Sequence, residues 1–181
     1  MNEKEKMLSG LLYNPNFDGL VEERVKAKKL CYKYNAELNK NYIKSLLGKT
    51  GEIFQIEPNF FCDYGYNIKI GENFYSNHNL VILDPAPVIF GDNVFIGPNC
   101  GFYTAEHPLD AERRNQGLEY AKPINVGNNV WFGGGVTVVS GVTIGDNVVI
   151  GAGSVVVKNI PSNVVAVGNP CKVIKQLWIT K

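Results

Sequence analysis

The chain has 181 residues, of which 45% are apolar and 19% charged, so it can bury one sizeable core. Its 18 Lys and Arg nearly balance 17 Asp and Glu, which excludes a strongly basic nucleic-acid binder and an acidic tail. No early apolar run resembles a signal peptide and none is long enough to span a membrane, so we expect a cytoplasmic protein without nucleic-acid or membrane partners.

The first segment, residues 1–58, is predicted to be helical. Apolar residues stand among charges at roughly helical intervals, at Leu20, Val25, Leu30 and Tyr34. Asp18 is available as an N-cap and Gly48 as a stop signal. We expect one or two amphipathic helices that pack beside the first part of the remaining chain.

A six-residue repeat begins at Ile68 and dominates the chain. It is read in IKIGEN, VIFGDN, VFIGPN, INVGNN, VTIGDN and VVIGAG. Two apolar residues alternate before a glycine, as Val88 and Phe90 do before Gly91, which places both on one face of a short strand. The glycine indicates a turn with little room for a side chain. Residues 59–160 are therefore predicted to form a parallel β-helix, which buries a continuous aliphatic column.

Three hexads make one 18-residue coil, so Val88–Ala105, Ile124–Gly141 and Val142–Asn159 are predicted to be consecutive coils. The segment between the first two, residues 106–123, is also 18 residues long. Its expected core positions hold Pro108, Arg114 and Tyr120, and it carries a histidine and many charges. We predict an excursion loop, and loops on rigid scaffolds often carry function. Residues 161–181 are predicted to be a tail that caps the open end.

Four cysteines lie far apart with no CxxC spacing, at Cys31, Cys62, Cys100 and Cys171. This pattern predicts buried thiols in a reducing compartment and no metal site.

These motifs in this order resemble the maltose and galactoside O-acetyltransferases, a family of hexapeptide-repeat acyltransferases, with the maltose enzymes the nearer match. The similarity rests on the N-terminal helices, DYGYNIKIGENFYSNHN, YTAEHPLD and the run from GNNVWFGGG to NPCKVI. It implies an all-β fold, a left-handed parallel β-helix with N-terminal α-helices and an excursion loop. It also implies a homotrimer, acetyl-CoA as donor and sugar sites between adjacent subunits.

His107 is the predicted catalytic base. Transfer of an acetyl group to a hydroxyl needs a group that is neutral near pH 7 and can accept a proton. His107 lies where the repeat stops and matches the family's catalytic histidine, whereas His78 is expected to be structural. Loop carboxylates within about 4–6 Å would stabilise its imidazolium form. The candidates for this role are Asp110, Glu112 and Glu119.

Asn77 matches a family asparagine that binds the acceptor and stabilises the tetrahedral intermediate. The alternative for Asn77 is a turn asparagine in a left-handed conformation. Further predicted acceptor contacts are Asp63, Tyr75, Asp84 and Asp18. The aspartate at position 63, where galactoside enzymes carry serine, favours a glucosyl or glucosaminyl acceptor.

The predicted coenzyme A contacts combine small or apolar residues with cations, namely Trp131, Gly134, Ala152, Val157, Lys158, Lys172 and Lys175. Small residues let the pantetheine arm approach the backbone, and lysines suit phosphates. Trp131 could instead pack at a subunit interface, and the lysines could be merely solvated.

Three alternatives stay open at this level. The same scaffold could acetylate an antibiotic or another non-sugar acceptor. It could be a metal hydratase of the carbonic anhydrase type, but that site needs three histidines and the chain has two. It could also be a catalytically silent scaffold.

Overall fold

The computed structural model describes residues 1–178, apart from the side chain of Asp18. Three helices come first, α1 (Glu3–Leu8), α2 (Asp18–Glu37) and α3 (Lys40–Leu46). Because α2 begins at Asp18 itself, its N-cap position is Phe17, and the helix starts one residue earlier than predicted. Within residues 1–178, no helix is long and apolar enough to cross a membrane.

The buried face of α2 agrees only in part with the expected one, and Leu30 is partly buried against the core. Leu20 and Tyr34 are buried as predicted, together with Ala27 and Cys31, whereas Val25 is 43% exposed. The buried positions are 7, 4 and 3 residues apart, which keeps them on one helical face. α2 packs against the strand from Phe60 to Cys62, so the helical segment covers the first coil.

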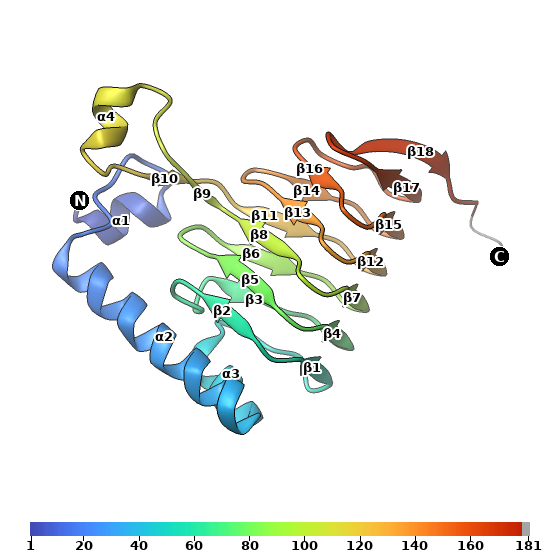
Figure 1. The fold of residues 1–181 in the computed structure, drawn as a ribbon, viewed down its shortest axis with the longest axis horizontal. Helices are drawn as coiled ribbons and strands as arrows, with labels where there is room; N and C mark the ends of the chain where they lie inside the picture. Colours follow the sequence, from blue (N-terminus) through green and yellow to red (C-terminus); the bar gives the residue numbers. More distant parts are fainter. Residues whose placement is uncertain (179–181) are drawn as a thin grey trace.

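The strands form the three faces of a parallel prism (Figure 1). The seven-stranded sheet holds β1 (Phe54–Ile56), β4 (Phe74–Ser76), β7 (Val94–Ile96), β12 (Val130–Phe132), β15 (Val148–Ile150), β17 (Val164–Val167) and β18 (Lys172–Gln176). The five-stranded sheet holds β2 (Phe60–Cys62), β5 (Leu80–Leu83), β8 (Gly101–Tyr103), β13 (Thr137–Val138) and β16 (Val155–Val156). The four-stranded sheet holds β3 (Ile68–Lys69), β6 (Val88–Phe90), β11 (Ile124–Val126) and β14 (Thr143–Ile144).

The prism extends beyond both of its predicted boundaries, at residue 59 and at residue 160. β1 already pairs with β4, so the first coil begins inside the segment predicted to be helical. At the other end β17 adds a further parallel strand, and β18 turns back antiparallel to it. The predicted tail therefore includes sheet structure.

The strand register confirms the excursion loop. Val88 pairs with Ile124, 36 residues later, whereas Asn125 pairs with Thr143, 18 residues later. The extra 18 residues thus leave the prism without forming a coil. The first coils are longer than predicted, because Phe54 pairs with Phe74 and Phe60 with Leu80, each 20 residues on. The two added residues lie where the five-stranded sheet leads into the four-stranded sheet.

We number the three corners in chain order. Corner 1 follows the seven-stranded sheet and holds residues 57–59, 77–79, 97–99, 133–135 and 151–153. Corner 2 follows the five-stranded sheet and holds residues 63–67, 84–87, 104–123, 139–141 and 157–159. Corner 3 returns to the seven-stranded sheet and holds residues 71–73, 91–93, 127–129, 145–147 and 161–163.

Corner 3 explains the repeated glycine. A Cβ at Gly127 would stand 2.8 Å from the carbonyl carbon of Gly145 and 2.9 Å from the backbone nitrogen of Asp146 in the next coil, so a side chain has no room there. The left-handed backbone falls two residues later, on asparagines such as Asn129 (φ 56°) and Asn147 (φ 54°). Their side chains form a ladder, with Asn129 donating to Asn147 at 3.1 Å and Asn147 to Asn163 at 2.9 Å.

The core is less aliphatic than predicted. Val and Ile fill much of it, but four buried phenylalanines stack edge to face along the prism axis. The ring centroids of Phe74 and Phe90 are 5.3 Å apart, those of Phe90 and Phe102 4.9 Å, and those of Phe102 and Phe132 5.2 Å. Edge-to-face contact is a preferred arrangement of aromatic rings, so the stack ties successive coils together.

The excursion loop contains β9 (Ala105–Glu106), α4 (Ala111–Asn115) and β10 (Tyr120–Ala121). It extends from corner 2 on the side away from the seven-stranded sheet and lies beside α1 (Figure 1). β9 and β10 pair antiparallel at its base. The loop is therefore held by both the prism and the N-terminal segment.

Candidate active site

Corner 2 brings together three of the residues predicted to act on an acceptor. Asp63 follows β2, Asp84 follows β5, and His107 lies in the loop that follows β8. Because β2, β5 and β8 are neighbours in one parallel sheet, the segments after them stack at one edge. The chain thus places two carboxyl groups and an imidazole on successive coils.

Asp84 orders this corner from inside. Its Oδ1 accepts hydrogen bonds from the backbone of Asp63 at 3.1 Å and Tyr64 at 2.9 Å, and its Oδ2 accepts from Gly65 at 2.7 Å. The residue has no exposed surface. Burial is the largest effect on the pKa of Asp84 and raises it, and the charge of Asp63 raises it further. The three backbone donors lower the pKa, and the balance sets it at about 7. Asp84 therefore holds the turn that carries Asp63, whereas direct acceptor contact had been predicted for it.

Asp63 is half-buried between this turn and α2. Burial raises the pKa of the Asp63 carboxyl, and Arg24 opposes that shift while the charge of Glu119 adds to it. Arg24 is held in place because it donates to the hydroxyl of Tyr64 at 2.8 Å. A carboxyl group in this setting can accept hydrogen bonds from hydroxyls of a bound molecule.

His107 lies in the excursion loop with 54% of its side chain exposed. Its Nδ1 is 3.3 Å from the carbonyl oxygen of Leu118, and a carbonyl can only accept. Nδ1 therefore carries the hydrogen in the neutral ring, and Nε2 carries the lone pair. Nε2 is 3.9 Å from Oε1 of Glu119, the closest of the predicted loop carboxylates. Asp110 instead caps α4 by accepting from the backbone of Arg113.

Glu119 is anchored by the N-terminal segment. The hydroxyl of Tyr13 donates to Oε2 of Glu119 at 2.8 Å, and the two backbones exchange hydrogen bonds of 2.9 and 3.0 Å. Tyr13 is 1% exposed, and burial, followed by the charge of Glu119, raises its pKa. Sequence reasoning missed Tyr13 because it stands outside the hexads and 106 residues from its partner.

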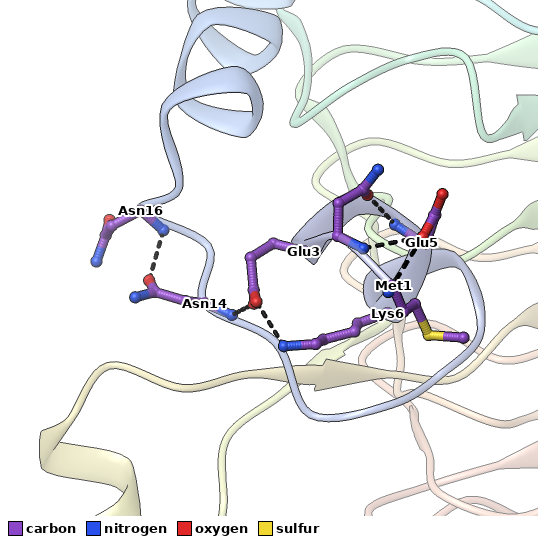
Figure 2. A network of polar contacts seen from close by, with 7 residues as sticks. Met1, Glu3, Glu5, Lys6, Asn14 and Asn16 are labelled. Carbon is purple, nitrogen blue, oxygen red and sulfur yellow. Dashed lines mark hydrogen bonds and ion pairs between the residues drawn. The ribbon is translucent and has the colours of Figure 1, made fainter.

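α1 and the segment that follows it are fastened by their own polar contacts (Figure 2). Asn2 and Glu5 form a capping box at the start of α1. The carboxylate of Glu3 accepts from Lys6 at 2.6 Å and from the backbone of Asn14 at 2.5 Å. Asn14 directly follows Tyr13, so this network also helps to hold Tyr13 in place.

Asn77 lies elsewhere, at corner 1. Its Oδ1 accepts from the backbone of His78 at 2.7 Å, so its Nδ2 is the group that can donate to a bound molecule. The left-handed residue of this turn is Asn79 (φ 64°), which removes the alternative explanation for Asn77. His78 contacts the carbonyl of Pro58 in the preceding coil through Nδ1, as expected for a structural residue. Tyr75 is half-exposed on the outer face of β4.

The residues predicted to hold coenzyme A fall into the same two groups. Trp131, 56% exposed, is on the outer face of the seven-stranded sheet. Gly134 and Ala152 lie at corner 1, and Lys172 and Lys175 lie on β18 at the end of that sheet. The other two predicted coenzyme A contacts, Val157 and Lys158, lie at corner 2, as His107 does. A single chain therefore keeps the predicted residues in two separate groups, here called half-sites, with Asn77 in one and His107 in the other.

The side chain of Asp18, an expected acceptor contact, lies outside the described residues. Among residues 1–178, no group of three or more His, Cys, Asp and Glu side chains could hold a metal ion. All four cysteines are buried and unbridged, as predicted.

Family models match most of the length of the chain. Residues 6–51 match the maltose acetyltransferase hexapeptide capping motif. Residues 87–104 match a hexapeptide repeat of succinyl-transferase, and residues 123–158 match the six-repeat bacterial transferase hexapeptide. The helical segment and the coils on both sides of the excursion loop are thus each matched.

Similar proteins cover nearly the whole chain. A Saccharomyces cerevisiae protein described as an acetyltransferase is 56% identical over 98% of this chain and 94% of its own. The crystal structure of a maltose O-acetyltransferase from Clostridium difficile 630 has a TM-score of 0.96 and 52% identity, over 98% of each chain. A galactoside acetyltransferase in complex with coenzyme A has a TM-score of 0.93 and 43% identity, covering 100% of this chain and 96% of that one. The coils described above are accordingly those of a hexapeptide-repeat left-handed β-helix.

Proposed function

The chain belongs to the family of maltose and galactoside O-acetyltransferases, and from this premise we propose that it transfers the acetyl group of acetyl-CoA to a hydroxyl of a glucosyl-type or related sugar. One observation carries the proposal. The imidazole of His107 is half-exposed, donates through Nδ1 to Leu118, and so presents the lone pair of Nε2 beside a corner rich in carboxyl groups.

In the proposed reaction Nε2 of His107 takes the proton of the acceptor hydroxyl as its oxygen attacks the thioester carbonyl carbon. A carbon–oxygen bond forms, giving a tetrahedral intermediate whose oxyanion needs a donor. Nδ2 of Asn77 suits that role because a neutral amide donates without titrating. The carbon–sulfur bond then breaks, and the proton on Nε2 passes to the departing thiolate of coenzyme A.

The acceptor would bind against Asp63. Its carboxyl group is held by the turn that Asp84 orders, and it can accept hydrogen bonds from two sugar hydroxyls. Tyr75 and Asp18 remain further candidates for acceptor contacts. The aromatic ring of Tyr75 could lie against an apolar face of the sugar.

The donor would lie between two subunits of a homotrimer. Related proteins of this fold have been solved with coenzyme A or acetyl coenzyme A bound. In a closed ring, corner 1 of one subunit can meet corner 2 of the next, which joins the two half-sites. Gly134 and Ala152 leave room for the pantetheine arm, Trp131 and Val157 line it, and the lysines suit the phosphates. These lysines are Lys158, Lys172 and Lys175.

The test is release of coenzyme A thiol from acetyl-CoA across a panel of sugars, aminoglycosides and amphenicols, with mass spectrometry of the products. We expect one acetyl group on a sugar hydroxyl. Turnover with an antibiotic and with no sugar would show that the acceptor belongs to a non-sugar class. No thiol release with any acceptor would overturn the proposed function.

A further inference from the structure

One peptide unit connects the N-terminal segment to the imidazole. The carbonyl of Leu118 accepts from Nδ1 of His107 at 3.3 Å, and the N–H of Glu119 donates to the carbonyl of Tyr13 at 3.0 Å. These two groups belong to the same peptide plane, in which a trans bond points C=O and N–H in opposite directions. Fixing the N–H on Tyr13 therefore aims the carbonyl at His107.

The side chains of Tyr13 and Glu119 form a second connection, which reaches the other ring nitrogen of His107. The Tyr13 hydroxyl binds Oε2 of Glu119 at 2.8 Å, and Oε1 of the same carboxylate is 3.9 Å from Nε2 of His107. Glu119 has 21% of its side chain exposed, and Tyr13 is almost fully buried. Tyr13 thus determines the position of a charge beside the proposed proton-accepting atom.

Other charged groups face this cluster. Asp63 lies close enough for Glu119 to raise its pKa, and Arg24 and Lys28 on α2 lower it. Tyr64 receives a hydrogen bond from Arg24. Two carboxyl groups held near each other repel, and a further cation that forms beside one of them relieves part of that cost. A protonated imidazole is such a cation.

We propose that Tyr13 is a positioning residue for His107: its backbone fixes the peptide that binds Nδ1, and its hydroxyl holds Glu119 where the carboxylate stabilises the imidazolium formed during the reaction. The inference rests on the proposed function for its role in turnover. It gives the N-terminal segment a part in the chemistry beyond covering the first coil.

The first test is a double-mutant cycle in the full-length protein with Tyr13→Phe, Glu119→Gln and their combination. Tyr13→Phe removes one oxygen atom and leaves both backbone hydrogen bonds. We expect each single variant to lower kcat by roughly 5- to 20-fold with little change in the acceptor KM. Because Tyr13 acts through Glu119, adding Tyr13→Phe to Glu119→Gln should cost less than about 2-fold more.

The matched control is Tyr42→Phe. The hydroxyl of Tyr42 donates to Glu37 at 3.0 Å. This variant therefore also removes a hydrogen bond from tyrosine to glutamate, but one that joins α3 to α2 and does not involve the excursion loop. Its kcat should stay at the wild-type value. Additive losses of kcat in the cycle would overturn the proposal. A rise in acceptor KM with kcat unchanged would also overturn it, because Glu119 would then contact the acceptor directly.

The second test does not depend on turnover. The chain has two histidines, so NMR can follow the imidazole of His107 with His78 as an internal reference. Glu119→Gln removes the carboxylate that lies 3.9 Å from Nε2, so the ring signals of His107 should change position in spectra recorded at one fixed pH. The His78 signals should not move. Unchanged His107 signals would refute the role of Glu119 even if the wild type acetylates sugars, and the expected change would support it even if no acceptor were found.

Discussion

Asn77 and His107 leave the prism of one subunit at different corners. Asn77 lies at corner 1, β5 spans the face that follows, and His107 lies in the loop from corner 2. β5 (Leu80–Leu83) runs along this face from corner 1 to corner 2, so the face separates the two corners by about 13 Å of extended chain at about 3.3 Å per residue. Asn77 and His107 thus lie at opposite ends of one face of the prism, and a site shared by both would take Asn77 from a neighbouring chain of the proposed homotrimer.

We therefore expect complementation between two inactive variants. Mixed trimers of His107→Ala and Asn77→Ala chains contain an interface at which both residues are native, so part of the activity should return. The measurement is thiol release after the two proteins are unfolded, mixed and refolded together. Each variant refolded alone is the control. Mixed assemblies with no more activity than these controls would rule out a site shared in this way.

Two buried serines should respond in opposite directions to loss of the hydroxyl. Within the described residues, Oγ of Ser76 has no hydrogen-bond partner, whereas Oγ of Ser154 donates to the carbonyl of Gly151 at 2.6 Å and accepts from Gly168 at 3.0 Å. Ser76→Ala should raise the free energy of unfolding by about 1 kcal/mol, and Ser154→Ala should lower it by about 1–3 kcal/mol. Urea unfolding at one protein concentration measures both, and the reverse order would contradict this account of the core.

The stability of the fold should depend on the protonation of Asp84. Its folded pKa of about 7 lies above the model value of 3.8, so the folded state binds this proton more tightly than the unfolded chain does. The resulting stabilisation is present in acid and is lost as pH rises through about 7. Between pH 4.5 and pH 8 the loss should be roughly 2–3 kcal/mol.

The comparison for this prediction is Asp84→Asn, which keeps the shape but cannot titrate. Its amide nitrogen would face the N–H of Gly65, so the variant should be less stable at every pH. The decisive quantity is the difference in unfolding free energy between wild type and variant. This difference should shrink from pH 4.5 to pH 8, and a difference that stays constant would mean that Asp84 is charged throughout this range.

The sequence predicts the prism because its hexads leave a regular signal, with paired apolar residues and a glycine whose missing side chain makes room for the next coil. The excursion loop follows from the charges at positions where the core needs apolar residues. The two longer coils could not be predicted, because residues added at corner 2 disturb the period without any signal of their own. The stack of phenylalanine rings from Phe74 to Phe132 could not be predicted either, because the hexad pattern distinguishes apolar from polar residues and not aromatic from aliphatic ones.

The candidate site was predicted in part for the same reason. His107 is recognisable because it lies where the repeat stops, Asp63 is predicted from the family resemblance, and corner 2 brings the two together. The burial of Asp84 depends on three backbone donors in another coil, which no local pattern encodes. The contact of Tyr13 with Glu119 joins an irregular segment to an irregular loop, and neither has a period to align.

The most direct test of the central claim compares wild type with His107→Ala in steady-state acetyl transfer to the best sugar acceptor. The account predicts that kcat falls by about two to four orders of magnitude while the assembly stays intact by size-exclusion chromatography, because a positioned base contributes on the order of 10²–10⁴. An intact His107→Ala protein with near-normal kcat would contradict it.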